Sequence, residues 1–213
     1  MAWLLAPIYD RMLASAEQAG LRRWRGELLA GLSGRVVEIG AGTGANLGLH
    51  PAAISELVLT EPDPAMRGLL EAKLAERRVA GEIGPAAVEV RGDSADRLAE
   101  PDGSADAVVS FLVLCTVPDP VATLAEARRV LKPGGRLVFL EHVAAHDRPT
   151  RLRWQRRIDP IWRRVAGGCR LTRDTERMIT DAGFTLETIT RQSARKMPAV
   201  VRATIRGAAV APS

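Results

Sequence analysis

The sequence contains few cysteines and no long apolar run. Its two cysteines, Cys115 and Cys169, lie far apart in the chain, so their spacing predicts neither a disulfide framework nor a metal site. No apolar run approaches the roughly 20 residues that a membrane-spanning helix needs. The apolar stretch at residues 3–8 is short and follows no basic segment, which argues against a secretory signal. We therefore expect a cytoplasmic protein without a bound metal.

The sequence also lacks any stretch in which basic and aromatic residues alternate, and aromatic residues make up only 4% of it. The chain is nevertheless basic, with a net charge of +5, and its basic excess lies in residues 151–206. Such a region can face anionic lipid, nucleic acid or an acidic substrate, or can simply be a solvated surface. Because stacking platforms for bases need aromatic side chains, we expect no nucleic-acid partner. A basic nucleic-acid-binding module stays as the non-enzyme alternative.

The chain length and the order of apolar segments predict one α/β domain. Its 213 residues, 46% of them hydrophobic, can bury a sizeable core. Strand-like runs alternate with helical segments, and this alternation favours a parallel sheet covered by helices. The strands are expected at residues 36–39, 57–59, 87–90, 107–111, 136–141, 184–190 and 199–205. We expect a three-layer αβα, Rossmann-like fold with a seven-stranded, mostly parallel sheet and an antiparallel last strand.

The stretch VVEIGAGTGAN at residues 36–46 combines a buried strand with a glycine-rich turn. Its β-branched residues suit a strand that is covered on both faces. Gly40, Gly42 and Gly44 permit a sharp turn and leave no Cβ between the main chain and a ligand. We expect a short helix to follow and to end near Leu49, which would point its free N–H groups at the ligand.

Glu38 lies inside this strand, two residues before the first glycine. A carboxylate is costly to bury without a partner. The pyrophosphate of a dinucleotide would repel it, whereas a ligand with a cationic amino group would be attracted. The glycine spacing and Ala45 also depart from the dinucleotide fingerprint. We therefore place an NAD-type dehydrogenase, and a tight turn with a structural Glu, among the alternatives.

The pattern E-x-G-x-G-x-G at residues 38–44 resembles motif I of the class I S-adenosylmethionine-dependent methyltransferases. The segments D-G-S-x-D-x-V at 102–108 and A-x-R-V-L-K-P-G-G-x-L at 127–137 resemble the same family. The resemblance implies S-adenosylmethionine as cofactor and S-adenosylhomocysteine as product. The expected cofactor-binding residues are Glu38, Gly40, Ala41, Gly42, Gly44, Asn46, Glu61, Pro62, Asp93, Ser94, Phe111 and Leu112.

Acidic residues follow the second and third expected strands. Glu61 could accept hydrogen bonds from both ribose hydroxyls, a device that NAD enzymes and S-adenosylmethionine enzymes share. In the family that the sequence resembles, Asp93 and Ser94 would hold the adenine, with the carboxylate accepting from the exocyclic amine. The alternative for Asp93 is a helix N-cap.

Residues 111–116, after the fourth expected strand, are almost wholly apolar. They contain neither the acids of metal-dependent catechol enzymes nor the Asn-Pro-Pro-Tyr motif of DNA-base enzymes, which argues against both. The segments L-V-L-C-T-V (112–117), E-H-V-A-A (141–145), D-P-x-W (159–162) and G-C-x-L-T-R (168–173) resemble the methyltransferase-like thiol S-methyltransferases. Those enzymes are relatives of the ubiquinone and menaquinone C-methyltransferases.

This closer resemblance favours S-methylation of a small thiol by in-line displacement. A thiol has a pKa of about 8.5 and needs no strong base. The alternatives are C- or O-methylation of a quinone-type or other small aromatic substrate, and N-methylation of a phospholipid. An alcohol would need a general base, for which His142 is the best candidate, although a lone histidine is more often structural.

Residues 1–34 are expected to form an N-terminal helical lid, and residues 35–213 the methyltransferase domain. Tyr9, followed by Asp10, resembles the lid of ubiquinone-biosynthesis-type methyltransferases and is the second catalytic candidate. Alternatively, Tyr9 packs with its hydroxyl at the surface. The sequence indicates no oligomeric state.

Residues 150–166 form a basic amphipathic stretch that Pro160 should kink or split. Its apolar face comprises Trp154, Ile158, Ile161, Trp162 and Val165. This face could pack on the sheet, cover the substrate or rest on a membrane surface. The thiol methyltransferases carry a long N-terminal membrane anchor that this sequence does not show, so we expect at most weak peripheral membrane contact.

Overall fold

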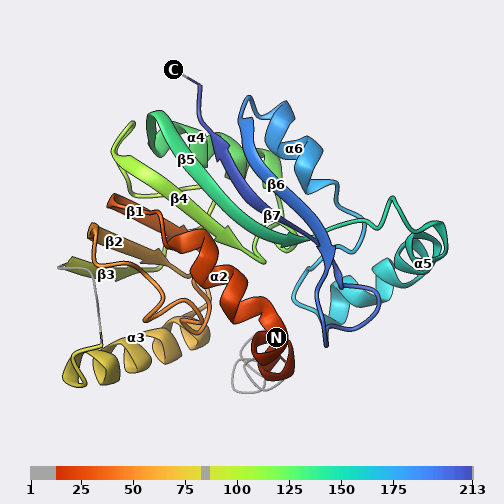
Figure 1. The fold of residues 1–213 in the computed structure, drawn as a ribbon, viewed down its shortest axis with the longest axis horizontal. Helices are drawn as coiled ribbons and strands as arrows, with labels where there is room; N and C mark the ends of the chain where they lie inside the picture. Colours follow the sequence, from red (N-terminus) through yellow and green to blue (C-terminus); the bar gives the residue numbers. More distant parts are fainter. Residues whose placement is uncertain (1–12, 83–86, 213) are drawn as a thin grey trace.

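Seven strands form one mixed sheet in the computed structural model, which describes residues 13–82 and 87–212 (Figure 1). The strands are β1 (Gly34–Ile39), β2 (Ile54–Thr60), β3 (Ala87–Arg91), β4 (Ala105–Phe111), β5 (Leu131–His142), β6 (Thr185–Ser193) and β7 (Ala203–Val210). Their order is β3-β2-β1-β4-β5-β7-β6. The strands from β3 to β5 pair in parallel, whereas β7 is antiparallel to both β5 and β6. The expected Rossmann-like α/β fold with an antiparallel last strand is therefore confirmed.

Helices cover both faces of this sheet. They are the π-helical turn η2 (Glu17–Leu21), α2 (Arg22–Leu29), α3 (Pro64–Val79), α4 (Pro120–Val130), α5 (Pro149–Val165) and α6 (Thr175–Asp181). In Figure 1, α2 crosses in front of the sheet, while α4 lies behind it. Neighbouring residues of β1 belong to the hydrophobic cores on opposite faces of the sheet. Val36 lies in the core with side chains of α2 and α3, and Val37 in the core with those of α4 and α6. Both valines are fully buried, as a strand in the middle of three layers requires.

Helices α3 and α4 each begin directly after an aspartate that caps their first turn. Asp63 and Asp119 each accept hydrogen bonds from the N–H groups two and three residues further on, and a proline follows each of them. The aspartate provides an acceptor for two backbone N–H groups of the first turn that have no partner within the helix. The proline fixes φ near its helical value. Both helices return the chain to the amino end of the sheet, so the loops at the carboxyl end are held from both sides.

The segment after the glycine turn is not the expected helix. Residues 42–49 form successive turns instead, in which the N–H of Leu47 bonds to the Gly44 carbonyl (3.2 Å) and that of Leu49 to the Asn46 carbonyl (2.9 Å). Gly44 and Gly48 have φ of 81° and 76°. These left-handed values interrupt a right-handed helix, so no helix N-terminus faces the loop.

Strand β5 begins at Leu131 rather than at residue 136 as predicted, because residues 131–135 also belong to it. Ala105 of β4 pairs with Leu131 and Ala107 pairs with Arg136, so residues 132–135 form a wide bulge. Gly134, at φ 73°, supplies the left-handed residue of this bulge. Pairing therefore starts before the bulge and resumes after it.

The C-terminal elements differ in position from the predictions. Helix α6 begins at Thr175 and is capped by Asp174, whose side chain accepts the Arg177 N–H. Strand β7 starts at Ala203 rather than at residue 199. Its small residues have weak strand propensity, but Gly207 is needed there because a Cβ would lie 2.0 Å from the Thr188 carbonyl oxygen. That close contact occurs at the bulge of β6.

In the part of the N-terminal segment that the structure describes, η2 and α2 continue one helix. Gly20, at φ 143°, interrupts its regular geometry. The lid candidate Tyr9 lies outside the described residues. Among the helices of residues 13–82 and 87–212, none combines the length and the apolar character that crossing a bilayer demands.

Candidate functional site

The three motif glycines at the end of β1 have different surroundings. A Cβ on Gly40 would lie 2.7 Å from the Val113 side chain, and one on Gly44 would lie 2.7 Å from Leu47. These two glycines are therefore needed for packing. Around Gly42, at φ 59°, the described part of the chain places only the Gly40 carbonyl oxygen near the missing Cβ, at 4.0 Å. The turn thus presents bare backbone to open space at Gly42, where a ligand can approach closely.

Glu38 lies beneath this turn and is 3% exposed. Its Oε1 accepts a hydrogen bond from Asn46 Nδ2 at 2.8 Å. His50 Nε2 is 2.9 Å from Oε2, but the orientation does not make a hydrogen bond, so Oε2 has no hydrogen-bond partner among the described residues. A buried carboxylate oxygen without a donor is costly. A cationic amino group of a ligand would satisfy it.

Arg25 of α2 joins this cluster, and the sequence did not identify it. Its Nη1 donates to Asn46 Oδ1 (3.1 Å), and its Nε donates to Glu17 (3.1 Å). The guanidinium also lies 5.6 Å from the centre of the Phe111 ring. Arg25 is 4% exposed. Arg25 shares a helical face with apolar residues, and this pattern is the one sequence signal that could have indicated its burial.

Asn46 consequently has both ends of its amide engaged, by Arg25 and by Glu38. Its expected role in cofactor binding stays a prediction. The chain of contacts from α2 through Asn46 to β1 fixes the Glu38 carboxylate, because each side chain orients the next. The N-terminal helical segment is thereby tied to the glycine turn.

Glu61, at the end of β2, has a carboxylate that could accept two hydroxyl groups. Oε2 accepts the Gly42 N–H and Oε1 accepts the Asp63 N–H, both at 2.9 Å. Each oxygen keeps a further lone pair. Burial raises the pKa of Glu61, and the two backbone N–H groups partly counteract this. The two bonds hold the carboxylate next to Gly42, while the following Pro62 is exposed.

Asp93 and Ser94 lie in turns after β3 rather than at a helix start. Asp93 Oδ2 accepts the Ala99 N–H at 3.0 Å, and the Ser94 hydroxyl bonds to Asp96. No helix begins there, so the N-cap alternative for Asp93 is wrong. The adenine contact stays a prediction.

The loop after β4 is shaped by one buried carboxylate, that of Glu141. It accepts bonds from the Ser110 hydroxyl (2.8 Å) and from three backbone N–H groups at 3.1, 3.1 and 3.3 Å. Those groups belong to Val113, Leu114 and Cys115. Glu141 is fully buried, and burial raises its pKa. Leu112 of this loop has φ 63°, which is uncommon for a residue other than glycine and is typical of functional sites.

His142, the candidate base, does not face solvent. Its Nε2 lies 2.8 Å from Cys169 Sγ, and the ring is 3% exposed. Cys115 is also buried here, so the two cysteines that lie far apart in the sequence meet around one histidine. Hydrogen bonds from Cys115, His142 and Trp162 lower the pKa of Cys169. The same bond to Cys169, together with burial, raises the pKa of Cys115.

Helix α5 docks through polar side chains, so the alternative in which its apolar face packs on the sheet does not describe its docking. Gln155, fully buried, accepts the Ala145 N–H (2.8 Å) and donates to the Val200 carbonyl (2.8 Å). Asp159 accepts the Leu171 N–H at 2.7 Å. The helix is continuous through Pro160, so the expected split does not occur.

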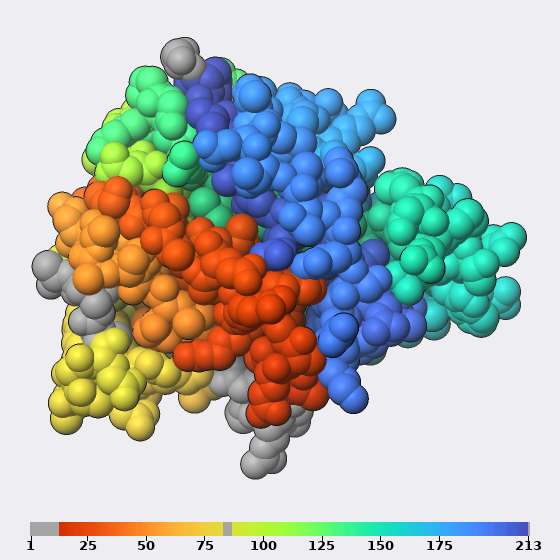
Figure 2. Space-filling model, in the orientation of Figure 1, coloured from red at the N-terminus to blue at the C-terminus, as the bar shows by residue number. Residues whose placement is uncertain are grey.

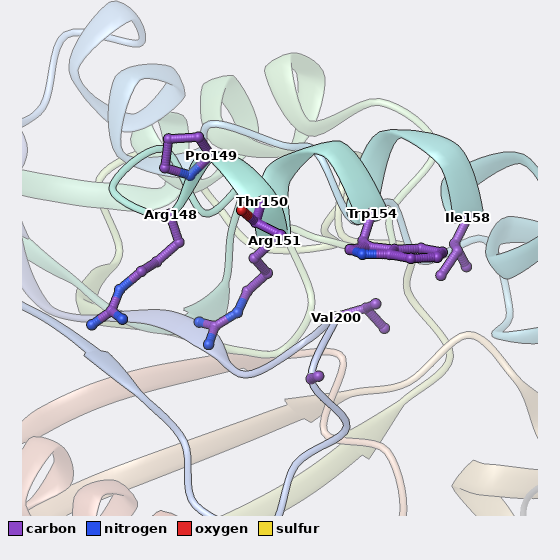
Figure 3. Close-up of a pocket in the computed structure, with 8 residues that line it drawn as sticks. Arg148, Pro149, Thr150, Arg151, Trp154, Ile158 and Val200 are labelled. Carbon is purple, nitrogen blue, oxygen red and sulfur yellow. The ribbon is translucent and has the colours of Figure 1, made fainter.

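The apolar side of α5 faces solvent. Trp154, Ile161 and Val165 are 56%, 64% and 60% exposed. In Figure 2, α5 projects from the right edge of the molecule. A groove of about 630 Å³ runs beside it, with Trp154 and Ile158 on the helix side and Val200 opposite (Figure 3). Arg148 and Arg151, near the start of α5, also line this groove.

Comparison with known proteins gives consistent matches. The family described as "Methyltransferase domain" matches residues 37–139. Thiol S-methyltransferase TMT1B of Homo sapiens is 37% identical over 191 residues, which are 89% of this chain and 75% of that protein. Thiol S-methyltransferase TMT1A of Homo sapiens is 35% identical, covering 83% of this chain and 70% of that protein. The phosphatidylethanolamine N-methyltransferase of Cereibacter sphaeroides is 32% identical, covering 67% and 66%.

Solved structures agree on the fold. A S-adenosylmethionine-dependent methyltransferase of Thermotoga maritima superposes with a TM-score of 0.68 at 19% identity, covering 98% of this chain and 97% of that one. The geranyl diphosphate C-methyltransferase of Streptomyces coelicolor A3(2) gives a TM-score of 0.65 at 16% identity, covering 88% and 75%. At these identities the likeness concerns architecture alone.

Proposed function

Since this chain belongs to the class I S-adenosylmethionine-dependent methyltransferases, we propose that it methylates the sulfur of a small thiol by in-line displacement. Its enzyme class is that of the methyltransferases, with S-adenosylmethionine as the methyl donor of the family. The observation that carries the thiol proposal is the 37% identity to a thiol S-methyltransferase over 89% of the chain. This span includes more than the cofactor-binding half, which all family members share.

The residues at the carboxyl ends of β1 and β2 suit this cofactor. Among residues 13–82 and 87–212, no group donates a hydrogen bond to the buried Oε2 of Glu38, and none lies within 4 Å above Gly42 except a backbone oxygen. Glu61 offers two acceptor oxygens. Glu38, Gly42 and Glu61 would hold the amino group, the methionine portion and the ribose, respectively. When bound, S-adenosylmethionine supplies an electrophilic methyl group on a sulfonium. The protein's task is then to align the acceptor and to exclude water.

The loop after β4 favours a methyl acceptor that can lose its proton without a strong general base. The Glu141 carboxylate is occupied by four donors, and His142 faces Cys169 rather than an open space. An alcohol would need a general base. A thiol of pKa about 8.5 already provides some thiolate at neutral pH. These contacts therefore support a thiol over an alcohol.

An acceptor series with labelled cofactor tests the proposal. The purified chain is expected to methylate an alkyl thiol at least about 100-fold faster than the alcohol with the same carbon skeleton. Because the thiolate is the nucleophile, the rate should rise about tenfold between pH 6.5 and 7.5 for a thiol of pKa about 8.5. A quinol and phosphatidylethanolamine serve as further acceptors. Faster transfer to either of them would refute the thiol proposal in favour of C-, O- or N-methylation.

We also propose that α5 makes weak peripheral contact with an anionic lipid surface. Its exposed apolar residues Trp154, Ile161 and Val165 share one side of the helix, and arginines flank them. A basic helix with an exposed apolar stripe suits the interface between anionic head groups and acyl chains. The charge complementarity supports a lipid surface rather than a neutral protein partner.

Vesicle binding tests this contact. The chain is expected to sediment with vesicles containing phosphatidylserine, and less so with neutral vesicles or at high salt. Ile161→Ser should reduce the partition coefficient roughly tenfold, because it removes one exposed apolar side chain that would be buried in the membrane surface on binding. Val121→Ser, at a 66% exposed position of α4, is the matched control and should leave binding unchanged. Equal binding to neutral vesicles, or equal loss in both variants, would contradict the proposal.

A further inference from the structure

Three side chains that commonly bind metals meet at the carboxyl ends of β4 and β5. Cys115 lies in the loop after β4, His142 ends β5, and Cys169 lies between α5 and α6. Their ligand atoms are all within 4.8 Å of one another, and all three residues are buried, with 2%, 3% and 9% exposure. We propose that these residues bind one Zn²⁺ ion through two thiolates and one imidazole nitrogen.

The donor set fits zinc by its chemistry. Two thiolates and a neutral imidazole carry a charge of −2, which a divalent cation balances in this buried place. Thiolate and imidazole ligands in a tetrahedral arrangement select zinc over the harder magnesium and calcium ions, which prefer oxygen. Binding converts two thiols to thiolates and releases their protons to solvent. The cluster contains no carboxylate ligand that would favour a harder ion.

The distances need only small adjustments. Zn–S bonds of about 2.3 Å and Zn–N bonds of about 2.0 Å place tetrahedral donors roughly 3.5 Å apart. His142 Nε2 and Cys169 Sγ are now 2.8 Å apart, so the ring would have to move by less than about 1 Å. Rotation about the cysteine and histidine side-chain bonds provides such a shift without moving the backbone.

The backbone around the cluster is held by other contacts. The Arg170 N–H donates to the Cys115 carbonyl oxygen at 2.9 Å, and the Arg173 guanidinium binds the Leu114 carbonyl. Trp162 Nε1 donates to Cys169 Sγ at 3.3 Å. Such an N–H···S bond from outside the ligand set is typical of metal sites, where it orients the thiolate. The loops are thus positioned for a metal before it binds.

Three protein ligands leave one position of a tetrahedral zinc ion open. Structural zinc sites use four protein ligands, whereas sites with three keep a place for water or another small ligand. The proposed centre therefore belongs to the open type. None of its three ligands is Glu38 or Glu61, the acids assigned to the cofactor, and its occupancy can be measured on the chain without cofactor.

Metal binding can be measured on the full chain without an activity assay. The reduced, chelator-treated protein is expected to bind one equivalent of Zn²⁺. With Co²⁺ as the spectroscopic probe, it should show thiolate-to-cobalt charge-transfer absorption. The chain has only two cysteines and three histidines, so this absorption can come only from Cys115 and Cys169. Added Zn²⁺ should remove it and should raise the thermal midpoint.

Matched variants identify the ligands. Cys115→Ser, Cys169→Ser and His142→Gln should each weaken Zn²⁺ binding at least 100-fold, with circular dichroism as the check on folding. His146→Gln is the control, because this histidine is 59% exposed and outside the cluster. Absence of charge-transfer absorption in the wild-type protein would overturn the proposal. So would a mass deficit of two hydrogen atoms in protein purified without added reductant, since it would show that the two thiols had been oxidised by dissolved oxygen to a Cys115–Cys169 disulfide instead.

Discussion

Replacing Glu38 with Gln is expected to weaken S-adenosylhomocysteine binding roughly 30-fold or more, while 5′-methylthioadenosine binds as before. The two ligands share the adenosine and the sulfur, but only the first has a cationic amino group. Gln keeps the shape of the side chain and removes its charge. Removing one partner of a buried charge pair costs about 2 kcal/mol or more, which corresponds to this loss of affinity. Isothermal titration calorimetry with both ligands measures the difference.

The control for this substitution is Glu56→Gln. Glu56 lies on the neighbouring strand β2, where its side chain is 51% exposed and paired with Arg35. The affinity for either ligand should be unchanged in this variant. If Glu38→Gln weakened both ligands equally, the carboxylate would matter only for the shape of the turn, through Asn46. If it weakened neither, the assignment of the amino group to Glu38 would be wrong.

The central strands were predictable because their residues leave few alternatives. The β-branched residues at 36–39 followed by glycines require a buried strand and a sharp turn, and the Asp-Pro pairs at 63–64 and 119–120 mark helix starts. Local patterns of this kind do not depend on distant contacts. The fold and the position of the glycine turn followed from them directly.

The predictions failed where distant segments decide the structure. Gly44 and Gly48 adopt left-handed φ in the turns on either side of Asn46, which contacts Arg25 of α2. This contact joins distant segments, so no local sequence pattern indicates it. Helix α5 shows the same limit. Its amphipathic pattern left open whether the apolar face docks on the sheet, and backbone groups near residues 145, 171 and 200 bind its polar side chains instead.

The meeting of Cys115 with Cys169 shows why part of the site escaped prediction. Their separation in the chain carries no spacing signal, and only the crossing of the loops after β4 and α5 brings them together. By contrast, Glu38 and Glu61 were found because each lies next to a strand end, where a sequence pattern is informative. Their roles toward the cofactor remain predictions that the Glu38 experiment can test.

Removing the carboxylate of Glu141 should cause the largest loss of stability. In Glu141→Ala, the Ser110 hydroxyl and three backbone N–H groups of the following loop lose their acceptor inside the protein. Each buried donor left unsatisfied costs about 1–3 kcal/mol, so the expected loss is about 4 kcal/mol or more. For a chain of this size, that corresponds to a drop in thermal midpoint of roughly 8–16 °C. Differential scanning calorimetry measures it.

The matched control is Glu187→Ala on β6, where the carboxylate is 38% exposed and pairs with Arg136. An exposed pair contributes at most about 1 kcal/mol, so its midpoint should fall by only a few degrees. Hydrogen exchange adds a local readout: amides 113–115 should lose protection in Glu141→Ala before the rest of β4 does. Equal stability of the two variants would mean that water or another side chain replaces the carboxylate. The loop after β4 would then be held by Arg173 and the packing of Val113, rather than by the charge at the end of β5.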